Sequence, residues 1–63
     1  MEWIIRISLT NGRMSYWNKI GEGDPPRTMI RDTATKFKDK KLCIIKLNEL
    51  EVKYNRIFNI EEY

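Results

Sequence analysis

The chain has 63 residues, of which 41% are hydrophobic and 33% charged, a composition typical of one small globular domain that excludes a disordered tail. Lys and Arg number 12 and Asp and Glu number 9, so the net charge of +3 is only mildly basic. The absence of His excludes imidazole catalysis and His-ligated metal sites. The lone Cys43 can form neither an internal disulfide nor a cysteine zinc cluster.

The sequence also gives expectations about the compartment. No apolar run approaches about 18 residues, so we expect no membrane span. Residues 1–8 lack the basic start and the small-residue cleavage site of a signal peptide. We therefore expect a reducing, cytoplasmic environment and a single domain over residues 1–63.

The N-terminal segment is predicted to form a β-hairpin. Residues 2–10 follow a period of two, as in a half-buried strand, and the apolar face carries Trp3, Ile5, Ile7 and Leu9. Asn11-Gly12 then favours a two-residue type I′ turn, in which both residues have positive φ. Residues 13–18 return as the second strand.

A two-residue turn fixes which residues oppose one another in this hairpin. It places Thr10 opposite Arg13 and Arg6 opposite Trp17. It therefore puts Trp17, Arg6 and Ile4 together on the face away from the core. Trp and Arg are enriched at binding hot spots, so this trio is the predicted partner-binding patch. The alternative is that a loop or the stem of Arg6 covers Trp17.

The middle of the chain begins with a loop and continues with an ambiguous segment. Residues 21–26 have the Gly, Asp and Pro composition of turns. Asp24 as N-cap and Pro25 in the first turn would start a helix over residues 27–37, although the threonines there disfavour one. The competing interpretation is an irregular crossing segment with a short extended piece at residues 34–37.

Residues 39–55 can be read as a helix or as strands. As a helix, the segment is capped by Asp39, ends at Asn55 and carries an apolar stripe at spacings of three and four: Cys43, Ile44, Leu47, Leu50 and Tyr54. As strands, residues 41–47 and 50–58 form a second hairpin, which suits the β-branched side chains better. The prediction adopted is the helix, followed by a last strand at residues 56–60.

In a helix, Ile45 and Val52 lie on the same side, because seven residues are close to two turns. That side is nearly opposite the apolar stripe. Such aliphatic side chains are either scattered surface residues or a second packing surface. On the second interpretation, Ile45 and Val52 are predicted self-association residues of a homo-oligomer such as a dimer.

Together the elements predict an α+β fold. A small antiparallel sheet, made of the N-terminal β-hairpin and the C-terminal strand, packs on one helix. The alternative is a ββαββ arrangement with a central helix at residues 27–37 and a second hairpin after it.

Residues 32–41 read Asp-Thr-Ala-Thr-Lys-Phe-Lys-Asp-Lys-Lys and follow a predicted hairpin that ends in aromatic residues. The Ala-x-x-Phe segment from Ala34 to Phe37, with the lysine-rich helix start after it, resembles a pattern of short phage and prophage proteins. The resemblance covers residues 2–60. It implies an origin in a mobile element and a fold of two strands, a helix and a strand.

The chain has no group of residues that indicates catalysis. Cys43 lies in an apolar run and is interpreted as inert packing. No His is present to activate a hydroxyl nucleophile, and no glycine-rich phosphate loop occurs. We therefore predict a protein that is not an enzyme and that needs neither cofactor nor metal.

The first functional hypothesis is a small protein-binding module, specifically a phage-encoded inhibitor of a host protein such as an anti-phage defence component. Its place of action would be the cytoplasm of a bacterial host. The alternative is a nucleic-acid-binding or transcription-related accessory protein. The contact residues would then be the basic run Lys36, Lys38, Lys40, Lys41 and Lys46.

Overall fold

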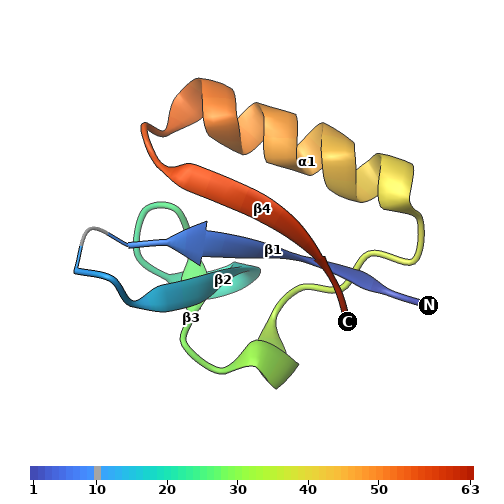
Figure 1. Ribbon diagram of the computed structural model, residues 1–63, viewed down its shortest axis with the longest axis horizontal. Coiled ribbons are helices and arrows are strands. Elements are labelled where there is room, and N and C mark those ends of the chain that lie inside the picture. Colours follow the sequence, from blue (N-terminus) through green and yellow to red (C-terminus); the bar gives the residue numbers. More distant parts are fainter. Residues whose placement is uncertain (10) are drawn as a thin grey trace.

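The computed structural model describes residues 1–9 and 11–63. The elements run in the order β1 (Trp3–Ser8), β2 (Met14–Glu22), β3 (Arg27–Thr28), the 3-10 helix η1 (Arg31–Thr33), α1 (Lys40–Lys53) and β4 (Ile57–Glu62). Neighbouring strands pair antiparallel in the order β3-β2-β1-β4. Figure 1 shows α1 running along β4, with η1 on the opposite side of the molecule. The predicted α+β fold is confirmed, and the ββαββ alternative is wrong.

The side chains of β1 alternate between the two faces of the sheet. The fully buried Ile5 and Ile7 point toward α1, where they pack with Cys43 and Leu50 of the helix and Phe58 of β4. We call this side of the sheet the inner face and the other side the outer face. Partly buried side chains complete the core: Trp3, Leu9, Phe37, Leu47, Tyr54 and Ile60.

The hairpin turn differs from the predicted one. Leu9 donates its N–H to the carbonyl of Arg13 at 2.9 Å and accepts from the N–H of Gly12 at 3.1 Å, so three residues separate the closing pair. Gly12, the residue before Arg13, has a φ of +80°. A glycine with positive φ at the end of a three-residue loop is the next common hairpin geometry. The predicted pairing of Thr10 with Arg13 lies outside the described residues.

The longer turn shifts the hairpin register by one residue and moves Trp17 to the inner face. Trp17 is 8% exposed within the core, and its ring stacks on that of Phe37 with centroids 5.8 Å apart. Arg6 pairs with Tyr16 instead. Ile4 remains on the outer face but is fully buried there. The predicted placement of Trp17 on the face away from the core is therefore wrong, whereas Ile4 lies on that face but is covered there.

Residues 27–37 do not form the alternative helix; they cross the sheet irregularly, as the competing interpretation expected. The N–H of Thr35 donates to the carbonyl of Trp17 at 3.0 Å. Phe37 and Trp3 then exchange two main-chain hydrogen bonds of 2.8 Å each. The predicted extended piece thus lies beside the start of β1, and Ala34 within it is buried.

The loop between β2 and β3 folds back against the end of α1. A Cβ added at Gly21 would lie 2.5 Å from the carbonyl oxygen of Arg27, so the close approach of the two backbones requires glycine. Pro25 is buried and follows a cis peptide bond. The hydroxyl of Tyr54 donates to the carboxylate of Asp24, which links this loop to the C-terminal end of α1.

The helix begins as predicted and ends slightly earlier. The Asp39 carboxylate accepts a 2.9 Å hydrogen bond from the N–H of Lys41, as an N-cap does. At the other end, Tyr54 has an extended backbone and donates its N–H to the carbonyl of Leu50. The helix therefore stops at Lys53 rather than at Asn55.

The predicted apolar stripe is confirmed with one exception. Cys43 and Leu50 are buried, and Leu47 and Tyr54 are half-buried against the same core. Ile44 is 39% exposed, because it lies at the margin of the stripe.

The predicted last strand is present, but it begins one residue later and ends two residues later than predicted. In β4, Phe58 faces the core and Ile57 points to the outer face with 67% exposure. Tyr63 donates its N–H to the carbonyl of Glu2 at 2.8 Å, and Figure 1 shows the two termini close together.

Candidate functional site

The side of α1 that points away from the core carries an exposed apolar strip. Leu42, Ile45 and Val52 are 56%, 54% and 91% exposed. Spacings of three and seven residues place them along one side of the helix. An open, shallow depression lies between Ile45 and Val52 and is also lined by Asn48 and Glu49. We call these five residues the α1 outer surface.

This exposure follows from the amino-acid sequence of the helix. Residues 42–45 are four consecutive apolar residues, which span more than one turn, so a sheet on one side of the helix cannot cover all of them. The predicted exposure of Ile45 and Val52 is confirmed. Leu42 was missed, although its position three residues before Ile45 was the available signal.

Charged groups border the strip and partly neutralise one another. The Nζ of Lys46 lies 2.7 Å from Oε2 of Glu49, an i, i+3 ion pair on the helix surface. The same ammonium group lies 5.2 Å from the centroid of the Trp17 ring. Lys46 therefore covers the edge of the core with its stem while it pairs with a residue of the α1 outer surface.

The predicted trio of contact residues is not brought together. Trp17 belongs to the inner core, whereas Ile4 is buried on the outer face. Arg6 is half-buried on that outer face, with Nη1 3.3 Å from Oε1 of Glu61. The aromatic residue opposite Arg6 is Tyr16 rather than Trp17. The shift of the hairpin register by one residue accounts for the exchange.

A network of polar contacts closes the outer face near the termini. Nε of Arg31 donates to Oε2 of Glu61 at 2.8 Å, and Nη2 donates to the carbonyl of Glu62 at 3.0 Å. The hydroxyl of Tyr63 donates to Oδ1 of Asp32 at 2.7 Å, which raises the pKa of the Tyr63 phenol. The hydrogen bond to Glu61 likewise raises the pKa of Arg31. These groups satisfy one another and fasten η1 to β4.

The predicted basic run does not form one continuous face. The ammonium of Lys46 lies over Trp17 on the inner side, whereas that of Lys36 lies 4.5 Å from the ring centroid of Tyr63, beside the outer-face network. Lys40 lies over Trp3, at 5.0 Å from the ring centroid. Lys38 and Lys41, the remaining members of the run, are exposed. Nucleic-acid binding by these five lysines stays a prediction.

The one cysteine of the chain lies in the core. Cys43 is fully buried, and this burial raises the pKa of its thiol and so disfavours the reactive thiolate. Across residues 1–9 and 11–63, no group of three or more Cys, Asp or Glu side chains is placed to hold a metal ion.

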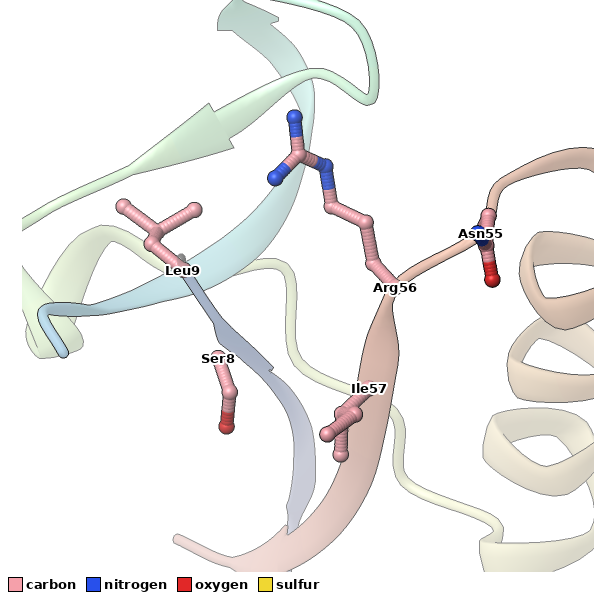
Figure 2. Close-up of a pocket in the computed structure, with 5 residues that line it drawn as sticks. All are labelled: Ser8, Leu9, Asn55, Arg56 and Ile57. Carbon is pink, nitrogen blue, oxygen red and sulfur yellow. The ribbon is translucent and has the colours of Figure 1, made fainter. Parts of the chain in front are cut away.

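A second hollow lies where β1 ends and β4 begins. Figure 2 shows its lining, which consists of Ser8, Leu9, Asn55, Arg56 and Ile57. Its volume of about 200 Å³ is below the ~300 Å³ at which small-molecule sites usually begin. The guanidinium of Arg56 extends past Leu9 toward β2 in this view. The hollow is therefore smaller than a usual small-molecule site.

No known protein family, curated protein or solved structure matches the chain. In the part of the chain that the structure describes, no helix is long and apolar enough to span a membrane.

Proposed function

We propose that the protein is a non-enzymatic protein-binding module that contacts its partner through the α1 outer surface. The observation that carries this proposal is the exposure of Leu42, Ile45 and Val52 on one side of α1, 91% in the case of Val52. Large aliphatic side chains that line up on one helix face in a chain of this size are typical of an interaction surface.

The partner that fits this surface presents an apolar groove to a helix. Leu42, Ile45 and Val52 have the spacing of anchor residues in helix-in-groove recognition. The charged border, with Glu49 on the surface and Lys41 beside it, favours a groove whose rim carries charges of both signs. Such charges contribute more to orientation and association rate than to affinity, which the aliphatic anchors supply.

The resemblance to short phage and prophage proteins extends the proposal to the partner's identity. It supports a phage-encoded inhibitor of a host protein, such as an anti-phage defence component, in the bacterial cytoplasm. A rigid helix face is sufficient for such a role, because inhibition requires only that the bound module block a site or an assembly surface. Self-association through Ile45 and Val52 is a second use of the same surface.

The test compares matched substitutions at two exposed aliphatic residues. Val52→Glu places a charge on the α1 outer surface, whereas Ile20→Glu makes the same kind of change at an 86% exposed residue that belongs to β2 and not to that surface. With the partner isolated from a bacterial host lysate, we expect Val52→Glu to weaken binding at least tenfold, about 1.4 kcal/mol, and Ile20→Glu to leave it unchanged. Equal binding by the two variants would contradict the proposal.

A third variant, Ile45→Glu, examines self-association through the helix face. If copies associate through Ile45 and Val52, Ile45→Glu lowers the mass measured by light scattering to that of the monomer. If the mass is unaffected, the α1 outer surface is free for a foreign protein.

A further inference from the structure

The two edges of the sheet differ in how they discourage further strand pairing. β3 has two residues and directly follows Pro25 and Pro26, so that edge is short and flanked by proline. β4 has six residues, contains no proline and pairs with β1 in a continuous register without a bulge. With this length and without proline or a bulge, β4 is the edge strand that can pair with another strand.

The hydrogen-bond pattern shows which main-chain groups of β4 point outward. Tyr63 donates its N–H to the carbonyl of the opposite residue, Glu2. Hydrogen-bonded and non-hydrogen-bonded pairs alternate along an antiparallel ladder. Phe58, Ile60 and Glu62 therefore direct their N–H and C=O groups away from β1.

Part of this edge is already occupied. Arg31 donates from Nη2 to the carbonyl of Glu62, at the end of the strand. Within the described residues, no hydrogen bond to the outward main-chain groups of Phe58 or Ile60 occurs outside the ladder with β1. The stretch that can receive another strand is thus centred on Asn59.

The amino-acid sequence of the strand is self-complementary around that residue. When two copies of β4 run antiparallel with Asn59 opposite Asn59, Arg56 lies opposite Glu62 and Phe58 lies opposite Ile60, each twice. The outward groups of Phe58 and Ile60 then meet as hydrogen-bonded pairs. On the inner face, opposite charges and apolar side chains are matched in the same register, which favours a second copy of the chain over an unrelated peptide. On the outer face, Ile57 lies opposite Glu61, which stays paired with Arg6 and Arg31.

We propose that two copies of the chain pair through the free edges of β4 and form one continuous antiparallel sheet. The proposal does not rest on the α1 outer surface, which points elsewhere and stays free in such a dimer. The side chains that choose the register are Glu62 and Arg56, the residue just before β4, and both are exposed. The Arg56 side chain extends toward β2 in the single chain (Figure 2), so pairing requires it to turn toward the free edge.

The position of α1 is compatible with this arrangement. Lys46 lies over Trp17 of β2, so that flank of the helix faces β2. Ile44 precedes Lys46 by two residues, which is about 200° around the helix axis. It therefore lies on the opposite flank of α1, above the free edge of β4, and is 39% exposed. Strands are spaced about 4.8 Å apart and α1 packs over β1 and β4, so the two helices would lie roughly 10 Å apart. This is a normal helix-packing distance, and it would cover Ile44.

The test reverses the charges one at a time and then together. The mass of the full chain is measured by light scattering over a concentration series for the wild type, Arg56→Glu, Glu62→Lys and the double variant. Each single change places like charges opposite each other twice, so we expect the dimer dissociation constant to rise at least about tenfold. The double variant restores opposite charges and should return to the wild-type constant.

Two further measurements separate the edge from other surfaces. Ile60→Pro removes an outward N–H without breaking the ladder with β1, so it should abolish the dimer while circular dichroism shows a folded chain. The matched reversal Lys19→Glu, at an exposed residue of β2 that β1 separates from the β4 edge, should leave the dimer unchanged. A wild-type monomer at every concentration would overturn the proposal. So would a dimer insensitive to both single reversals, or a monomer whose β4 edge binds extended peptides instead.

Discussion

The substitution Trp17→Ala distinguishes a core residue from a contact residue. Trp17 is 8% exposed, stacks on Phe37 and is covered by Lys46, so removing the indole leaves a cavity between the sheet and α1. Removal of a buried Trp typically costs about 3–5 kcal/mol. A chain of 63 residues has a total stability of only about 3–9 kcal/mol. We therefore expect the variant to lose most of its stability.

Thermal unfolding followed by circular dichroism measures this loss. Since 1 kcal/mol corresponds to roughly 4–8 °C in a domain of this size, Trp17→Ala should lower Tm by ~15 °C or more. The control is Val52→Ala, which removes methyl groups from a 91% exposed residue and should change stability by less than about 0.5 kcal/mol. If Trp17→Ala melted within a few degrees of the wild type, the inner-face placement of Trp17 and the hairpin register would both be refuted.

Four further experiments test individual features of the fold. Asp39→Ala removes the N-cap of α1 and should lower the free energy of unfolding by about 1 kcal/mol in urea titrations, whereas Asp39→Asn should retain most of it. Gly21→Ala places a Cβ 2.5 Å from the carbonyl oxygen of Arg27 and should lower Tm measurably, in contrast to the stabilisation that Gly→Ala usually gives at unstrained sites. Cys43 should react with a thiol reagent only as fast as the chain opens, and a fast reaction in native buffer would contradict its burial. Because burial raises the pKa of this thiol in the folded state, its contribution to stability is complete below the thiol's ordinary pKa of 9.0 and is lost as the pH rises through the folded value, which alkaline unfolding curves of wild type and Cys43→Ala would show.

The parts of the fold that the sequence predicts well are those decided by local spacing. The cap at Asp39 and the stripe containing Cys43 and Leu50 follow from helix geometry alone, and the structure contains both. The alternation along β1 likewise predicts which of its residues face the core.

The register error has a physical cause that local spacing does not reveal. Asn-Gly suits a two-residue turn, but a glycine with positive φ, such as Gly12, also suits a three-residue loop. The choice is decided by the whole sheet, since the longer loop buries Trp17 against Phe37, a residue from another part of the chain. Ile4 is also buried, on the outer face that the η1 segment flanks, although its alternation alone predicts exposure.

The free edge of β4 was not predictable, because the position of a strand within a sheet depends on strand order. The sequence predicts residues 56–60 simply as a last strand. The strand order places β4 at one edge of the sheet and β3 at the other. Only this order shows that Arg56 of one copy could lie opposite Glu62 of a second copy.

Small size gives the two exposed surfaces a common physical basis. A chain of 63 residues buries only about 60% of its unfolded surface, so association is an efficient way to add burial that its own core cannot supply. Pairing at β4 would stabilise the folded chain by mass action, and Tm should then rise with protein concentration for the wild type but not for Arg56→Glu. Binding of a partner at the α1 outer surface should persist in that monomeric variant, because Ile45 and Val52 are untouched by the change. If partner binding were lost together with the dimer, the two surfaces would have to act as one, and the partner would have to recognise the paired copies rather than the helix of a single chain.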